Sequence, residues 1–168
     1  ERAGLASVHV EVREKPSWFS GIEALASGKP VSLTSFGSKA MQDWVNERLA
    51  SGAISHIFVF SGQMAQYVPA DFDGRFIMDF VDVDSAKFES YAGEGNALMR
   101  WVHAREGKKL GDFEAEIAQR ADASLFVSEA EAKLFRERSG ANNIAALGNG
   151  IDTLFYDPAT KFKKLHPV

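Results

Sequence analysis

The chain has 168 residues, a length that suits one domain with a core of ordinary size. Hydrophobic residues make up 45% of it and charged residues 25%, which is typical of a globular protein and argues against disorder. The formal net charge of −4 gives no basis for binding nucleic acid, and the absence of cysteine excludes disulfides and thiolate metal sites.

The location of the protein is predicted from what the sequence lacks. No apolar run approaches the roughly 20 residues needed to span a bilayer. The first residues, Glu1-Arg2-Ala3, carry neither an initiator Met nor the apolar stretch of a signal peptide, which suggests a trimmed chain. We therefore expect a cytoplasmic protein, with peripheral contact at the inner face of the membrane as an open alternative.

The first third of the chain predicts a strand, a helix, a short extended piece and a second helix. Apolar and polar residues alternate over residues 6–13, where Val8, Val10 and Val12 favour a strand. Pro16-Ser17 begins a helix that ends at Gly28, with Trp18, Ile22 and Leu25 at helical spacing. Residues 30–36 are expected to be extended. A helix then runs from Ser38 to Gly52, with an apolar face of Met41, Trp44, Val45 and Leu49.

The rest of the chain continues the alternation of strands and helices. Buried strands are expected at residues 54–60, 75–81, 124–127 and 143–147. A short segment at 63–68, a long helix over about 95–121 and a helix from Ser128 to about Ser139 lie between them. Ser128 and Glu131 form a capping-box pattern at the start of that last helix.

This alternation predicts the fold class and the place of the ligand site. Strands that are apolar on both faces are typical of a parallel sheet covered by helices, so we expect an α/β, Rossmann-like three-layer α/β/α domain. Residues 1–150 would form the domain, and residues 151–168, with Pro158, Pro167 and three lysines, a linker. In such sheets ligands bind at the carboxyl ends of the strands.

Several of these strand ends carry sequence blocks that resemble one family. The blocks are residues 61–68, 78–88, 126–132 and 148–152. Together they resemble the amino-terminal domain of a glycosyltransferase of family 4 (group 1). The sugar transferases associated with PEP-CTERM/exosortase exopolysaccharide systems are the most similar subgroup. The resemblance covers residues 24–158, with Phe88 where the subgroup usually has Trp and Ile151 where Val is common.

The resemblance implies half of a GT-B enzyme, in which two Rossmann-like domains face each other across a cleft. This half would bind a glycan or lipid-linked acceptor. An absent carboxyl-terminal domain would bind the nucleotide-sugar donor, and transfer would be metal-independent and retain configuration. The family's first strand and Gly-rich loop also have no counterpart here. We therefore expect the chain to bind no cofactor, to be inactive alone and to self-associate through exposed cleft surface.

The resemblance and the strand ends together select the candidate site residues. Those expected to line the cleft are Ser61, Met64, Tyr67, Asp82, Asp84, Ser85 and Lys87. Asp82 and Asp84 are the candidates for a catalytic role, because many relatives place a catalytic His at the end of this strand. Those expected at the hinge to the second domain are Asn149, Gly150 and Asp152.

Other interpretations of the aspartates remain open. Asp82-Val83-Asp84 matches the pattern by which metal-dependent transferases hold Mn²⁺ or Mg²⁺, although we predict no metal here. A structural interpretation has these carboxylates cap the next helix and pair with Lys87. A rival function is a stand-alone Rossmann-like or receiver-type module in which Asp79, Asp82 and Asp84 bind Mg²⁺.

The long predicted helix has an acidic residue at an apolar position and a basic face. Glu106 occupies an apolar position, and a buried carboxylate is costly unless it is paired. We therefore expect an ion pair with Arg75, Arg100 or Lys87 in preference to a role in chemistry, or else a break at Gly107 that frees Glu106 to solvent. Trp101, Arg105, Lys108 and Lys109 form either a basic face for anionic lipid or an ordinary solvated face.

Overall fold

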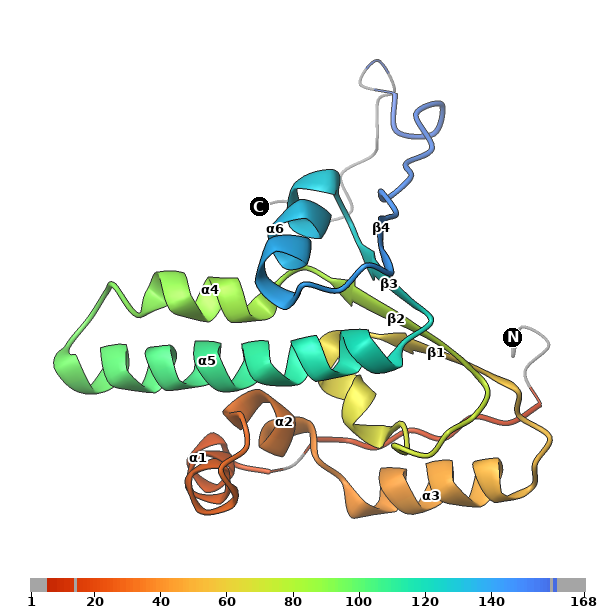
Figure 1. Cartoon of the computed structure of the whole chain (residues 1–168), viewed down its shortest axis with the longest axis horizontal. Coiled ribbons are helices and arrows are strands. Elements are labelled where there is room, and N and C mark those ends of the chain that lie inside the picture. Colours follow the sequence, from red (N-terminus) through yellow and green to blue (C-terminus); the bar gives the residue numbers. More distant parts are fainter. Residues whose placement is uncertain (1–5, 14, 158, 160–168) are drawn as a thin grey trace.

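The computed structural model describes residues 6–13, 15–157 and 159 (Figure 1). Its centre is a four-stranded sheet of β1 (His56–Phe60), β2 (Arg75–Val81), β3 (Ala123–Phe126) and β4 (Ile144–Ala146). All neighbouring strands pair in parallel, in the order β1-β2-β3-β4. The mixed α/β class is therefore confirmed, and the sheet is consistent with a Rossmann-like α/β/α domain. The four buried strands predicted from the sequence are all present.

Six α-helices and one 3₁₀ helix are present in the described residues. They are α1 (Ser17–Ser27), α2 (Val31–Phe36), α3 (Lys39–Ala50), η1 (Gly62–Tyr67), α4 (Asp84–Tyr91), α5 (Ala97–Arg120) and α6 (Glu129–Ser139). Ser128 caps α6 as predicted, and Ser38 caps α3, each accepting a backbone hydrogen bond 3.2 Å long. Within the described residues no helix has the length and apolarity to cross a membrane. Of the predicted linker, Pro158, Pro167 and the lysines lie outside the described residues.

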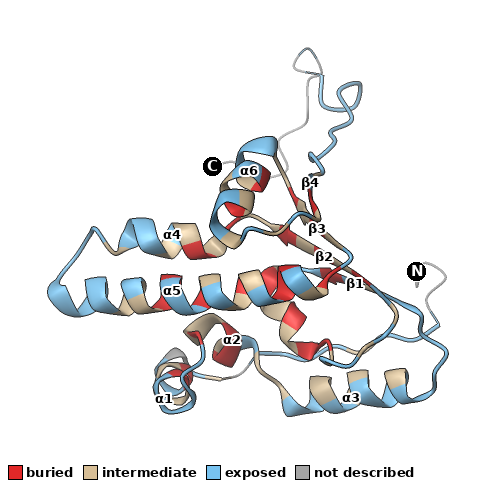
Figure 2. Cartoon of the chain, in the orientation of Figure 1, coloured by how far each residue is buried: buried red, intermediate tan, exposed pale blue. Residues whose placement is uncertain are grey.

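The core lies between one face of the sheet and helices α5 and α6 (Figure 2). Phe80 of β2, Phe126 of β3 and Phe135 of α6 are almost fully buried, with ring centroids 4.7–5.3 Å apart. Side chains that alternate with these point to the opposite face, where Phe58 and Phe60 of the edge strand β1 are about 60% exposed. One face of the sheet is thus closed, while β1 has an open edge.

Residues 6–13 do not form the strand that their alternation predicts. They pair with none of the four described strands, and Val8, Val10 and Val12 are 52–76% exposed. His9 instead stacks on Trp44 of α3, with ring centroids 5.3 Å apart. The prediction is wrong because alternation favours a strand only where its apolar side is buried. Here no described strand pairs with the segment, and its valine side stays exposed.

The expectation of an extended piece at residues 30–36 is also wrong, because these residues form α2. Pro30 has no side-chain acceptor for the first amides of the helix. Glu106 of α5 supplies it, since its carboxylate accepts the backbone N–H groups of Val31 at 2.7 Å and Ser32 at 2.8 Å. The contact between α5 and α2 thus overrides the extended preference of β-branched Val31 and Thr34.

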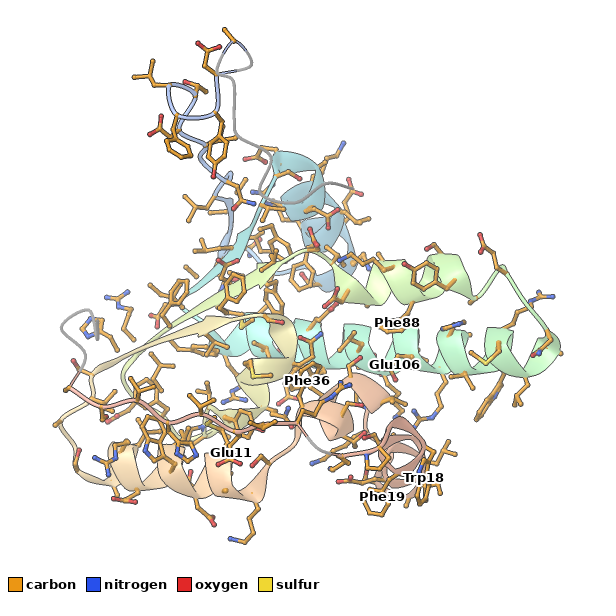
Figure 3. All side chains as sticks on the ribbon, turned by 180° about the vertical axis from the view of Figure 1, so that it is seen from behind. Glu11, Trp18, Phe19, Phe36, Phe88 and Glu106 are labelled. Atoms are coloured by element: carbon orange, nitrogen blue, oxygen red, sulfur yellow. The ribbon has the colours of Figure 1, made fainter. Side chains whose placement is uncertain are left out.

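The same contact corrects the predictions made for Glu106. The side chain is 3% exposed and lies between α5 and α2 (Figure 3). Its hydrogen-bond partners are two backbone amides and the Ser32 hydroxyl, the last at 2.7 Å, so the expected ion pair with Arg75, Arg100 or Lys87 is absent. Gly107 continues the helix and does not free Glu106 to solvent. A helix N-terminus carries partial positive charge and compensates the buried carboxylate in place of a cation.

Glycine allows α4 to approach α5 closely. A Cβ atom on Gly107 would lie 2.8 Å from Glu89 Cγ and 3.2 Å from both the Glu89 nitrogen and the Ser85 carbonyl oxygen of α4. We expect Gly107→Ala to lower the free energy of unfolding by about 1 to 3 kcal/mol, because the backbone of α4 has to move. Urea denaturation measures this change.

Gly111 is a matched control one helical turn later. A Cβ atom there would lie 3.5 Å from Ser85 Cβ, which is an ordinary contact. Gly111→Ala should therefore raise stability by up to about 1 kcal/mol through the higher helix propensity of alanine. Equal stabilisation by both substitutions would contradict the close packing of α4 on α5.

Candidate functional site

The carboxyl ends of β1 and β2 bring together residues that are about twenty positions apart in the sequence. Ser61 follows β1, and Asp82 and Asp84 follow β2. The two strands are parallel neighbours, so their ends meet at one edge of the sheet. The Ser61 N–H donates to the carbonyl of Asp79 at 2.9 Å and fixes the two ends side by side.

A continuous hydrogen-bonded network joins these residues. The Ser61 hydroxyl donates to the Gln63 side-chain oxygen, and the Gln63 amide donates to Asp84 Oδ2 at 2.9 Å. Lys87 Nζ lies 2.8 Å from Asp82 Oδ2 and 3.1 Å from Asp84 Oδ1. We call these five residues the carboxyl-edge cluster. They include four of the predicted cleft residues, together with Gln63, which the prediction missed.

The carboxyl-edge cluster is open to solvent and carries a net negative charge. Lys87, Asp82 and Asp84 expose 47%, 37% and 27% of their side chains. Partial burial lowers the pKa of the Lys87 ammonium, but its bonds to the two carboxylates outweigh this effect and raise that pKa above its ordinary value. Lys87 thus remains charged and leaves one excess negative charge on the cluster.

The backbone is unusual at both strand ends. Ser61 and Val81 have φ angles of 72°, in the left-handed region that non-glycine residues rarely adopt. Val81 is β-branched, which makes this conformation especially costly. The pairing of β2 with β3 also shifts register between Asp79 and Val81. Strain of this kind is concentrated at functional sites in proteins, so it marks the same edge as the cluster does.

The start of α4 is held by two glutamates from other helices. Glu131 of α6 accepts the Val83 N–H at 2.8 Å, and Glu114 of α5 accepts the Ser85 N–H at 3.1 Å. Neither Asp82 nor Asp84 caps α4, so that part of the structural interpretation is wrong, while the pairing with Lys87 is confirmed. Both aspartates therefore keep their carboxylates at the surface.

Three of the predicted cleft residues lie in packing contacts. The buried Tyr67 hydroxyl donates to the carbonyl of Phe36 and accepts the Ser38 N–H at 2.9 Å. Ser85 is 1% exposed, under α5. Met64 is half-buried and lines a cavity of about 270 Å³ beside residues 11–13 and Lys15. The structure thus separates these side chains from Lys87 and the aspartates.

The predicted hinge residues follow β4. Asn149, Gly150 and Asp152 are exposed. Asp152 Oδ1 accepts the N–H groups of Leu154 and Phe155, at 3.0 and 2.9 Å, and so forms a local turn. The structure gives these residues a surface position after the last strand of the domain.

The aspartates of the rival Mg²⁺ hypothesis have protein partners. No group of three or more His, Asp or Glu side chains is arranged to hold a metal ion in the described part of the chain. Asp79 Oδ1 accepts the Val81 N–H at 3.0 Å, and Lys87 bonds both other aspartates. The three carboxylates of the rival Mg²⁺ hypothesis are therefore engaged with protein donors.

The carboxyl-edge cluster has the groups needed to bind a polyol. Its carboxylate oxygens accept hydrogen bonds, while the Lys87 ammonium and the Gln63 amide donate them. A sugar hydroxyl both donates and accepts, so neighbouring hydroxyls can bond an aspartate and the lysine together. Comparison of the chain with protein-family models, curated proteins and solved structures finds no match, so the glycosyltransferase resemblance stays a prediction.

Proposed function

We propose that the chain is the acceptor-side domain of a retaining, metal-independent glycosyltransferase. The enzyme would transfer a sugar from a nucleotide-sugar in the synthesis of exopolysaccharide or another cell-envelope glycan. The proposal is supported by the sequence blocks at the strand ends and by the Rossmann-like parallel sheet. The chain alone would be inactive, because donor binding belongs to a second domain.

The observation that carries the proposal is the carboxyl-edge cluster. It lies where ligands bind in parallel α/β sheets, and it contains one strained residue, Ser61, and adjoins another, Val81. In the proposed enzyme Asp82, Asp84 and Lys87 would orient the acceptor hydroxyl groups across the cleft from the donor. Fixing the acceptor in a reactive geometry supplies a large part of the rate in bimolecular transfer.

The open edge of β1 supports the idea that the sheet continues in the whole enzyme. An apolar cavity of about 440 Å³ lies between β1 and α3, lined by the Trp44, Leu49 and Phe58 side chains among others. His56–Phe60 contains no proline, lysine or acidic residue of the kind that protects free edges. A further strand in this position would cover both the edge and the apolar face of α3.

A substitution in the full-length enzyme tests the proposal. We expect Asp84→Asn to lower kcat/KM for the acceptor by about 10- to 100-fold, since a hydrogen bond to a charged group contributes roughly 1.5 to 3 kcal/mol. The KM of the nucleotide-sugar should stay unchanged, because the donor binds to the other domain. Initial rates with varied acceptor and donor measure both constants.

Asp43→Asn is the matched control, because Asp43 forms an exposed ion pair with Lys39 on α3, outside the cluster. It should leave both constants unchanged. Failure of the full-length protein to hydrolyse or transfer any nucleotide-sugar would overturn the proposed function. A rise in thermal stability of the wild-type chain with Mg²⁺ or Mn²⁺ that Asp82→Asn abolishes would favour the rival metal-binding module instead.

A further inference from the structure

Helix α1 presents its large apolar side chains to solvent. Trp18, Phe19, Ile22 and Leu25 are 68%, 47%, 57% and 58% exposed. The residues that α1 buries against the domain are small, since Ser20 and Ala24 are both 0% exposed. Figure 3 shows Trp18 and Phe19 pointing away from the rest of the molecule. An amphipathic helix normally packs its bulky apolar face inward, so this arrangement is reversed.

Helix α5 extends this surface with a second tryptophan. Arg105 Nη2 donates to the carbonyls of Ala24 at 2.8 Å and Lys29 at 3.2 Å, which fixes α5 beside the end of α1. Trp101 lies four residues earlier on the same face of α5 and is 53% exposed. We call Trp18, Phe19, Ile22, Leu25 and Trp101 the α1 patch.

The charges around the α1 patch are mostly positive. Lys15 lies 6.0 Å from the centre of the Phe19 ring, Lys29 follows the helix, and Arg105 bonds to its last turn. Glu23 is the one acidic residue of α1, and Lys15 pairs with it at 2.7 Å. In the sequence Glu14 stands next to Lys15, so residues 14–29 together with Arg105 carry three cations and two carboxylates. Their net charge of +1 is opposite in sign to the −4 of the whole chain.

We infer that the α1 patch docks peripherally on a lipid bilayer that contains anionic headgroups. Tryptophan and phenylalanine beside Leu and Ile are typical of helices that lie in the membrane interface. The surrounding cations match an anionic headgroup layer, whereas a protein partner has no general requirement for them. The helix axis would lie in the plane of the interface, with Trp18 and Leu25 below the headgroups.

Sedimentation with lipid vesicles tests the inference on the chain as it is. We expect binding to phosphatidylcholine vesicles containing phosphatidylglycerol, and weaker binding at high salt or without the anionic lipid. Ile22→Glu combined with Leu25→Glu should reduce the partition coefficient at least about tenfold, because two apolar side chains no longer enter the bilayer. Lys29→Glu should reduce binding to the anionic vesicles only.

Leu147→Glu is the matched control, since Leu147 is 61% exposed and follows β4, at a distance from α1 in sequence and fold. It should leave vesicle binding unchanged. A chain with Trp44→Phe and Trp101→Phe keeps Trp18 alone, and its fluorescence should shift to the blue on binding. Absence of this shift and of sedimentation with anionic vesicles would overturn the inference.

Light scattering distinguishes docking on a membrane from an interface between copies of the chain. If the wild-type chain forms an oligomer that Ile22→Glu and Leu25→Glu dissociate, and vesicles bind neither protein, the α1 patch is a contact between copies and the inference is wrong. Vesicle binding needs no sugar transfer, so this experiment fails or succeeds independently of the proposed glycosyltransferase function.

Discussion

Glu114→Gln should remove a loss of stability that the wild-type chain undergoes between about pH 4.5 and about pH 7. Glu114 lies on α5 and is 2% exposed. One carboxylate oxygen accepts the Ser85 N–H at 3.1 Å, and the other has no hydrogen-bond partner in the described structure. Burial raises the pKa of this carboxyl group from 4.5 to about 7, and the hydrogen bonds from Ser85 only partly oppose that effect.

The direction of the pH effect follows from proton binding. Between pH 4.5 and about 7 the folded chain keeps a proton on Glu114 that the unfolded chain has released. The contribution of Glu114 to the free energy of unfolding is therefore greatest below pH 4.5, falls as the pH rises through this window and is constant above it. The pKa values of Glu114 in the folded and unfolded chain differ by an amount that corresponds to about 3 kcal/mol of unfolding free energy. This is a large share of the stability of a small domain.

Urea denaturation at a series of pH values measures the effect. Glu114→Gln should match the wild type near pH 4 and be more stable by about 3 kcal/mol near pH 8, because glutamine cannot ionise. The hydrogen bonds of Arg138 lower the pKa of Glu89, which gives an opposite pH dependence, but that contribution is present in both proteins and cancels in their difference. Glu116→Gln, on the exposed side of α5, should give no such difference. Parallel curves for wild type and Glu114→Gln would contradict a protonated Glu114.

The four parallel strands could be predicted because each is a short apolar run between turn residues. The helices at residues 17–27, 39–50, 97–120 and 129–139 could be predicted from their spacing and caps. The prediction omits the short helix α4, and it assigns the wrong conformation to residues 6–13 and 30–36. These two wrong assignments have a common cause. In both places the conformation depends on contacts with another part of the chain. No described strand pairs with the segment of Val8 and Val10, whereas Glu106 caps α2.

The composition of the candidate site could be predicted only in part. Parallel strands end at the same edge, so the neighbourhood of Ser61 and Asp84 follows from topology alone. The hydrogen bond from Gln63 to Asp84 depends on the turn of η1, which the sequence does not predict. The left-handed conformation of Val81 could not be predicted either, because β-branched residues rarely adopt it. The one signal for Gln63 in the sequence is that it is polar and stands two positions after Ser61.

Glu106→Ala should lower the free energy of unfolding by about 3 to 5 kcal/mol. The substitution removes the acceptor of the Val31 and Ser32 N–H groups and of the Ser32 hydroxyl, and leaves three part-buried donors without partners. Each unsatisfied buried donor costs roughly 1 to 3 kcal/mol. Glu106→Gln keeps the size of the side chain but turns an NH₂ group toward an N–H donor, so we expect a smaller loss of about 2 kcal/mol. Urea denaturation measures both changes.

The control variant and hydrogen exchange together separate capping of α2 from a general effect on α5. Glu116→Ala removes a carboxylate from the exposed side of the same helix and should change stability by less than about 0.5 kcal/mol. In Glu106→Gln the amides of Val31 and Ser32 should lose protection, while those of β2 and β3 keep theirs, because the sheet does not contact the substituted group. If protection fell equally in α2 and in the sheet, Glu106 would stabilise the core as a whole. Since Pro30 offers no side-chain acceptor, a selective loss would mean that α2 exists because α5 caps it.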